Sequence, residues 1–165
     1  MGRYAQLSSE IWFNKEFINL DSDKKVCYLY MLSCPHSNMN GFYRLPMRYI
    51  QADLGLTELE AQQLIKGLVE KKFIYYGNEV VLIRTYLKYN TPKSPTQLMG
   101  VGKALKTMPK RRLTTEFIYL VGLYCEKAYK WIDQDSLIYL REYPINDKGL
   151  DVLNIYNNYL LLGTI

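Results

Sequence analysis

The side chains with the most evident chemical role in this sequence are basic ones with no acid between them. Residues 80–115 carry eight lysines and arginines and no aspartate or glutamate. A stretch of one charge sign produces a local positive field, for which a polyanion is the natural partner, although a solvated lysine-rich connection is the alternative. The eight residues are Arg84, Lys88, Lys93, Lys103, Lys106, Lys110, Arg111 and Arg112.

A second set of polar side chains lies on a helix that we predict over residues 58–71. Gln62, Gln63 and Lys66 fall on its outer side, where glutamine can hydrogen-bond to adenine and lysine can reach guanine or phosphate. The same helix carries three acids that repel phosphate, so a merely solvated face is the alternative interpretation. These acids are Glu58, Glu60 and Glu70.

Metal and catalytic chemistry find little support. The chain has three cysteines and one histidine, His36, and no Cys-X-X-Cys pair, so we expect neither a zinc site nor a disulfide framework. We expect Cys27 and Cys34 to be small apolar residues on or near a helix. The sequence holds no phosphate-binding glycine loop, dinucleotide fingerprint or serine-hydrolase elbow. We therefore expect no enzyme activity and no cofactor.

The elements that position these side chains follow a definite order. Thr57 and Glu60 have the spacing of a reciprocal capping box at the start of the 58–71 helix. A short strand over residues 41–45 and a helix over 47–54, closed by Gly55, come before it. Two β-prone runs, 73–76 and 79–83, follow and join at Gly77-Asn78 as a hairpin. This order predicts a winged helix-turn-helix, in a fold that is mostly α with a small β wing.

The hairpin, or wing, is expected to contact nucleic-acid phosphates. Tyr75, Tyr76 and Asn78 lie within it and Arg84 lies beside it, and tyrosine and asparagine donate to phosphates without reading sequence. Arg48, on the 47–54 helix, completes the predicted DNA-binding set. Exposed tyrosines could also stack on single-stranded bases, although most of the 16 tyrosines have core spacing.

The N-terminal residues are expected to supply a helix and part of the core. Trp12, Phe13, Phe17 and Ile18 are the predicted anchors. A longer helix begins near residue 22, capped by Asp21 or Ser22, and stops before Pro35. Its apolar face is predicted from residues three and four apart, namely Val26, Leu29, Tyr30, Leu32 and Ser33.

Beyond residue 85 the pattern weakens. We expect a polar, proline-punctuated connection over residues 86–95, a basic helix over 97–107 that Gly100 and Gly102 weaken, and a helix from Thr114 to about Trp131. Residues 135–165 give mixed patterns. The predicted organisation is a winged-helix DNA-binding domain at residues 1–90, a basic linker or helix at 91–112 and a small helical region at 113–165.

Two further patterns concern location. No run approaches about 18 apolar residues, so we expect no membrane-spanning helix. The first six residues lack the apolar core of a secretory signal peptide. We therefore expect a cytoplasmic protein.

Several segments resemble the N-terminal domain of replisome organisers from phages and prophages of Gram-positive bacteria. The resemblance covers about residues 3–95. The segments are Arg3-Tyr4, Ser9-Glu10-Ile11-Trp12, Tyr28-Leu29-Tyr30-Met31-Leu32-Ser33, Pro35-His36, Gly41-Phe42-Tyr43-Arg44-Leu45 and Tyr89-Asn90-Thr91-Pro92-Lys93-Ser94-Pro95. The resemblance implies a winged helix akin to that of DnaD-type primosomal proteins. It also implies a role at a replication origin, with a helicase loader as partner.

Two other functions fit the same sequence. A transcriptional repressor or activator would use a similar winged helix as a dimer on a palindromic site, and residues 150–165 are apolar enough to support a homo-oligomer. Alternatively, the chain could capture a host replication protein, which the acids on the 58–71 helix favour. Fold alone does not separate these functions.

Overall fold

The computed structural model describes residues 6–108 and 112–137. The chain forms two compact units, residues 1–89 and 90–165, and each is described by itself. The described residues are mostly helical, with a small three-stranded antiparallel sheet in the first unit. The mostly α fold with a small β component is thereby confirmed at this coarse level.

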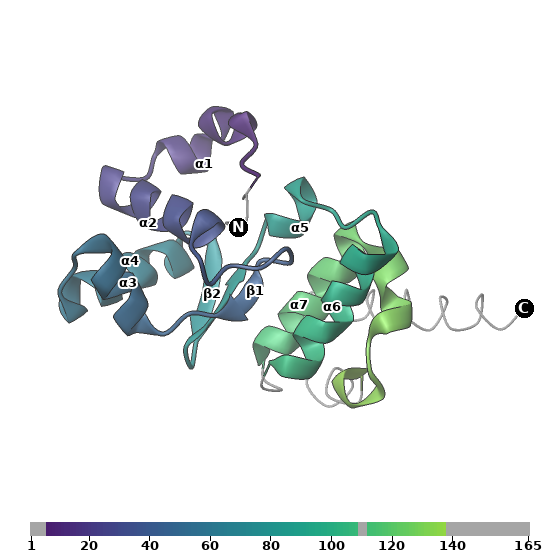
Figure 1. Cartoon of the computed structure of the whole chain (residues 1–165). Coiled ribbons are helices and arrows are strands. Elements are labelled where there is room, and N and C mark those ends of the chain that lie inside the picture. Colours follow the sequence, from purple (N-terminus) through teal and green to yellow (C-terminus); the bar gives the residue numbers. More distant parts are fainter. Residues whose placement is uncertain (1–5, 109–111, 138–165) are drawn as a thin grey trace, which may run out of the picture. The chain divides into compact units, whose positions relative to one another are not determined.

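The first unit begins with the short helical segments η1 (Ser9–Phe13) and α1 (Lys15–Ile18), followed by α2 (Ser22–Ser33). Next come β1 (Phe42–Arg44), α3 (Met47–Leu54), α4 (Glu58–Glu70), β2 (Ile74–Gly77), β3 (Val80–Ile83) and α5 (Tyr86–Tyr89). The strand order in the sheet is β1-β3-β2, so β3 pairs with both neighbours. In Figure 1, α2, α3 and α4 lie together beside this sheet.

Local sequence explains where the helices of this unit begin and end. The Asp21 carboxylate accepts the amide of Lys24 at 2.9 Å and caps α2, as predicted. Gly55 closes α3 with φ of +66°, which is the left-handed cap that its position predicts. The capping box at Thr57 and Glu60 also forms. These three helix boundaries are therefore encoded locally.

The core of this unit lies between α2, α3, α4 and the sheet. Its members include Met31, Ile50, Leu68 and Ile74, none of which has any exposed surface. Phe17 is also fully buried, and its ring packs near Tyr28 and Phe73. Burial of such side chains stabilises each by about 1.5–3 kcal/mol relative to exposure.

Two predictions about the core were wrong. Trp12, Phe13 and Ile18 are 54%, 82% and 49% exposed, because η1 and α1 are too short to turn all their apolar residues inward. Of the four predicted anchors, only Phe17 is buried. Val26 on α2 is also 53% exposed. The fully buried face of α2 is formed by Cys27, Tyr28, Met31 and Leu32, so the prediction is confirmed at Leu32. The predicted Leu29 and Tyr30 are partly buried against the same core, whereas Ser33, like Val26, is exposed.

The hairpin differs from its prediction by one residue. Gly77 pairs with Val80 as the last residue of β2, so Asn78 and Glu79 form the two-residue turn, rather than Gly77 and Asn78. Both turn residues have positive φ, 52° and 62°. This register places Ile74 and Ile83 opposite each other and buries both, which outweighs the preference of glycine for the turn.

The second unit contains α6 (Pro95–Thr107), α7 (Arg112–Tyr124) and η2 (Glu126–Trp131), and a further helical turn starts at residue 134. Phe117, Val121 and Ala128 are fully buried, as the predicted apolar face requires. Both α6 and α7 pack on η2. The α6 helix, predicted as part of a separate basic segment, packs on η2 within this unit.

Three boundaries near and within this unit were predicted wrongly. Residues 86–89 form α5, because Tyr86 and Leu87 are buried, whereas we expected a connection. Ser94 and Gln97 form a capping box that starts α6 at Pro95, earlier than residue 97. Thr114 lies buried in the first turn of α7 and does not start it, and α7 ends at Tyr124. The predictions for residues 138–165 lie outside the described residues.

Candidate functional site

The helix α4 carries the side chains predicted to read bases, and its start is fixed by the capping box. The Thr57 amide donates to Glu60 Oε2 at 2.8 Å, and the Thr57 hydroxyl accepts the amide of Glu60 at 3.3 Å. The Thr57 hydroxyl also donates to Glu60 Oε2 at 2.7 Å. This bond, and to a lesser extent the bond from the Thr57 amide, lowers the pKa of Glu60, so its carboxylate stays ionised beside the helix N-terminus. The first turn of α4 is therefore firmly negative.

The predicted base-reading residues are all exposed on α4, but two of them already have partners on the same helix. Gln62 Nε2 donates to Glu58 Oε1 at 3.1 Å, and Lys66 Nζ lies 3.9 Å from Glu70 Oε1. Exposed pairs of this spacing contribute only about 0.3–0.5 kcal/mol, so a ligand can replace them. Gln63 is exposed beside them and lines a surface hollow.

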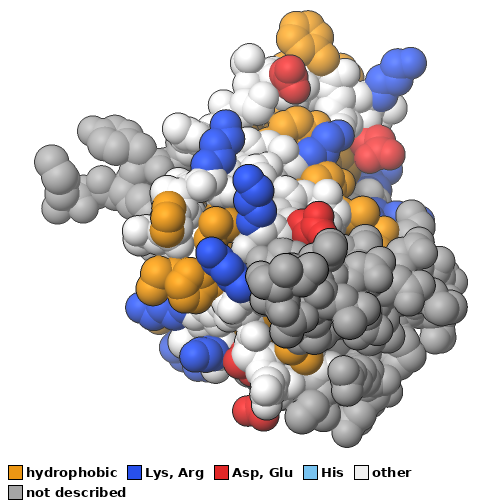
Figure 2. All heavy atoms as spheres, turned by 90° about the vertical axis from the view of Figure 1, so that its right-hand side faces the viewer, with side chains coloured by type: hydrophobic (Ala, Val, Ile, Leu, Met, Phe, Trp, Pro, Cys, Tyr) orange, Lys and Arg blue, Asp and Glu red, His pale blue; other side chains and the backbone are white. Residues whose placement is uncertain are grey.

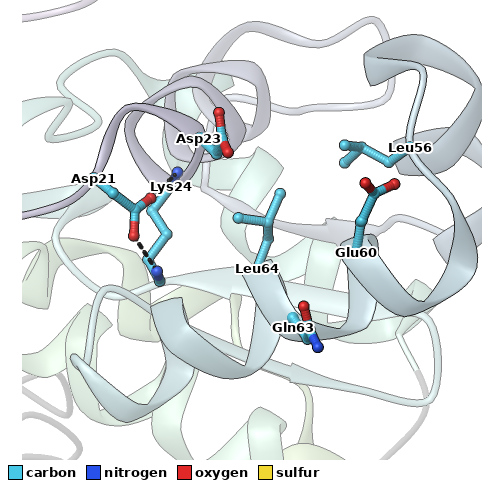
Figure 3. A pocket seen from close by; sticks show the side chains of 7 residues that line it. All are labelled: Asp21, Asp23, Lys24, Leu56, Glu60, Gln63 and Leu64. Carbon is cyan, nitrogen blue, oxygen red and sulfur yellow. Dashed lines mark hydrogen bonds and ion pairs between the residues drawn. The ribbon is translucent and has the colours of Figure 1, made fainter.

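That hollow lies between the start of α2 and the first half of α4. Figure 3 shows Asp21, Asp23 and Lys24 on one side and residues of α4 on the other. It has a volume of about 260 Å³, and Leu56 and Leu64 form its apolar part. Lys24 is ion-paired with Asp21, so the carboxylates of Asp23 and Glu60 leave the hollow with a negative balance. A phosphate group would be repelled there.

The tip of the hairpin combines strained backbone with an ion pair. Arg44 Nη2 on β1 lies 2.6 Å from Glu79 Oε2, and the amide of Leu45 donates to the Glu79 carbonyl at 2.7 Å. These two contacts hold Glu79 at a φ that non-glycine residues seldom adopt. Sequence reasoning missed this pair, because 35 residues separate its members and only the sheet register brings them together.

Two of the predicted wing residues have structural roles. The Tyr76 hydroxyl donates to the Leu45 carbonyl at 2.7 Å, and burial raises the pKa of Tyr76 to about 12. Arg84 Nη1 donates to the Lys72 carbonyl at 2.9 Å, and its guanidinium carbon lies 5.1 Å from the centre of the Tyr75 ring. Asn78, in contrast, is exposed at the tip of the hairpin.

The start of α3 carries a cluster that the sequence did not reveal. The His36 ring stacks on the Tyr49 ring, with centroids 4.2 Å apart and planes 17° from parallel. The guanidinium carbon of Arg48 lies 5.2 Å from the centre of the same Tyr49 ring. His36 and Arg48 are both exposed. The only local sequence cue is the neighbouring pair Arg48-Tyr49.

The basic stretch predicted from composition is divided between the two units. Lys88 lies in α5 of the first unit, with its ammonium 5.2 Å from the Tyr89 ring centre, and Lys93, Lys103 and Lys106 are exposed on the second unit. Figure 2 shows exposed lysine and arginine side chains with uncharged side chains between most of them. Lys110 and Arg111 lie outside the described residues, and Arg112 begins α7 with a side chain that is not described.

The cysteines and acids give no sign of a metal centre. Cys27, Cys34 and Cys125 are buried with free thiols, and burial raises the pKa of Cys27 to about 12, so this thiol stays protonated. Across residues 6–108 and 112–137, no group of three or more histidine, cysteine or acidic side chains could hold a metal ion. Among the helices described, none combines the length and apolar character needed to cross a membrane.

Comparison with known proteins gives no further guide to the site. No protein-family model matches the chain, and neither curated proteins nor solved structures contain a match.

Proposed function

We propose that the chain binds duplex DNA through a winged helix-turn-helix formed by residues 22–83, and that it acts in the initiation of DNA replication. The observation that carries this proposal is the order of elements, α2-β1-α3-α4-β2-β3, together with the strand order β1-β3-β2. A helix-turn-helix followed by a hairpin has this order. The left-handed Gly55 allows α3 and α4 to follow one another within three residues.

In this proposal α4 is the helix that enters the major groove, which is wide enough to admit an α-helix. Gln62 and Gln63 lie in its N-terminal half, the part that meets base edges in helix-turn-helix proteins. On binding, Gln62 would replace its exposed hydrogen bond to Glu58 with a hydrogen bond to a base edge. The exposed hairpin tip at Asn78 would lie along the backbone.

The charge distribution supports an affinity that comes mainly from outside α4. This helix has more exposed acids than bases, so its face does not attract phosphate by charge. Lys88, Lys93, Lys103 and Lys106 are exposed and can neutralise phosphates, with the unspecific and salt-dependent attraction that counterion release produces. Recognition by α4 and attraction by the basic residues are therefore separable.

A direct test is an electrophoretic shift assay with the full chain, a random duplex, an origin-containing duplex and the corresponding single strands. The proposal expects both duplexes to shift, with the origin duplex shifting at lower protein concentration. Absence of any shift at micromolar protein and about 50 mM salt would contradict it, because even unspecific binders have dissociation constants of about 10⁻⁴–10⁻⁶ M at physiological salt.

The replication role rests on the resemblance of residues 3–95 to phage replisome organisers, and a transcriptional regulator would use the same fold. Mapping bound sites across host and phage DNA separates these two functions. Binding concentrated at an origin supports initiation, and binding concentrated at promoters supports regulation.

One observation favours a second candidate function, the capture of a protein partner. The exposed face of α4 combines acids with Leu59, which is 63% exposed, and it borders the negatively balanced hollow at Asp23 and Glu60. The acids on this face, together with the apolar lining of the hollow at Leu56 and Leu64, suit a basic protein better than DNA. A host protein that co-purifies with the wild-type chain but not with Leu59→Lys, while DNA affinity stays unchanged, would support this candidate.

A further inference from the structure

A cluster of basic and aromatic side chains lies at the start of α3, outside the helix α4 that is proposed to read bases. His36 comes from the turn after α2, Arg44 from the end of β1, and Arg48 and Tyr49 from the first turn of α3. Tyr49 is the common neighbour: it stacks on His36, lies near Arg48 and interacts with the charge of Arg44. Two nitrogen-bearing side chains from separate elements, His36 and Arg48, therefore contact one aromatic ring, and Arg44 adds a further positive group at the end of the preceding strand.

Tyr49 also restrains two of these side chains before any ligand arrives. The planar stack and the cation–π contact already restrict the rotamers of His36 and Arg48, so less conformational freedom is lost when a ligand binds. Arg44 is held in a similar way by its bond to Glu79. The exposed donors of this cluster are thus partly preorganised.

The backbone at the same place adds positive character. Pro46 precedes α3 and provides no side-chain cap, and the first turn of this helix contains no acid. Uncapped amides at a helix start carry partial positive charge and donate hydrogen bonds to anions or water. Arg48 belongs to this first turn, and Arg44 lies two residues before Pro46, so their charges add to an environment that favours an anion such as a phosphate.

We propose that the cluster of His36, Arg44, Arg48 and Tyr49 binds one phosphate of the DNA backbone. This inference rests on the proposed function and adds to it a sequence-independent contact, on the same unit as α4. Arg48 supplies the main charge, and Tyr49 positions it. Glu79 weakens the site, because its carboxylate occupies Arg44 and would repel the phosphate.

The opposing roles of Arg48 and Glu79 give a test that loss of folding cannot imitate. We would measure fluorescence anisotropy of a labelled random duplex with the full chain over a range of salt concentrations. Removal of one phosphate contact lowers the slope of log K against log salt by about 0.9, which amounts to about eightfold in affinity between 1 M and 0.1 M salt. Arg48→Ala should show this loss at 0.1 M salt.

Glu79→Gln should instead tighten binding by about twofold or more at 0.1 M salt, because it removes the repelling carboxylate and frees Arg44. Lys15→Ala is the matched control, since Lys15 is also exposed on the first unit but lies on α1. Its affinity should stay close to that of the wild type. Thermal unfolding of each variant confirms that it is folded.

Two results would overturn the inference while leaving the proposed function intact. The first is that the wild-type chain binds the duplex and that the Arg48→Ala and Lys15→Ala variants bind it with equal affinity. The other is a Glu79→Gln variant that binds no more tightly than the wild type, and this result decides the matter even if Arg48→Ala does not fold. A wild-type chain that does not bind the duplex at all would overturn the proposed function and the phosphate site together.

Discussion

A Cβ atom on Gly102 would overlap the backbone carbonyl oxygen of Trp131, so α6 and η2 approach each other at a position that only glycine permits. Gly102→Ala should therefore destabilise the protein, although alanine favours a helix over glycine by about 1 kcal/mol. We expect a net loss of about 1–3 kcal/mol in the free energy of unfolding, measured by urea denaturation. Lys103→Ala, at the next and exposed position, is the control and should change little.

This contact explains a residue that the sequence pattern treated as a defect. Gly102 weakened the predicted 97–107 helix, whereas in the structure it is a packing requirement and is buried. A more stable Gly102→Ala variant would show that α6 and η2 do not pack as closely as described.

The apolar face of α4 can be tested at Leu68. This side chain is fully buried between α4 and the remainder of the core, so Leu68→Ala should lower the free energy of unfolding by about 2–5 kcal/mol. Leu59→Ala on the same helix removes the same atoms from an exposed position and serves as control. Equal losses for the two variants would mean that the faces of α4 are assigned wrongly.

The hydrogen bond from Tyr76 to Leu45 should make the hairpin sensitive to alkali. At neutral pH, Tyr76→Phe should cost about 0.5–1.5 kcal/mol of stability, because it removes one hydrogen bond. The pKa of Tyr76 is raised from 10.0 to about 12, chiefly by burial and less by Glu79, so the folded state favours the protonated hydroxyl.

The sign of the pH dependence follows from that shift. The contribution of Tyr76 is fully present below pH 10 and is lost as the pH rises to about 12, because the unfolded hydroxyl ionises first. Other buried tyrosines, such as Tyr28 and Tyr129, act in the same direction. Between pH 9 and pH 12, the free energy of unfolding should therefore fall less for Tyr76→Phe than for the wild type, as measured by urea denaturation at each pH. If the free energy of unfolding falls with pH equally in the two proteins, Tyr76 does not contribute to the alkaline sensitivity.

Sequence readout can be separated from attachment by comparing Gln63→Ala with Asn78→Ala. A good base contact discriminates by about 1–3 kcal/mol, so Gln63→Ala should narrow the gap between a preferred duplex and a random duplex. Asn78→Ala should weaken both duplexes alike, since contacts to the backbone carry no sequence information. Competition titrations measure both effects. If both variants weaken both duplexes equally, α4 does not read bases.

The sequence predicted those features of the first unit that local chemistry determines. Asp21, Gly55 and the pair Thr57 and Glu60 set helix ends through bonds between near neighbours, and all three predictions are confirmed. The buried thiols of Cys27 and Cys34 were also predicted. Such features need no knowledge of distant contacts.

Features that depend on distant contacts could not be predicted in the same way. The Trp12 and Phe13 side chains look like core residues, yet whether they are buried depends on what packs against η1. The turn at Asn78 and Glu79 follows the sheet register and not the local preference for glycine. The stack of His36 on Tyr49 joins residues 13 positions apart and had no local pattern to indicate it.

The central claim, that this chain binds duplex DNA, is tested most directly by the salt dependence of its affinity. The measurement is fluorescence anisotropy of the full wild-type chain with a random duplex from about 50 mM to 300 mM salt. If exposed lysines such as Lys103 and Lys106 neutralise phosphates, log K should fall linearly with log salt by about 0.9 for each phosphate contacted. We predict a slope corresponding to several phosphates. Binding too weak to measure at 50 mM salt, or an affinity that does not change with salt, would contradict the claim.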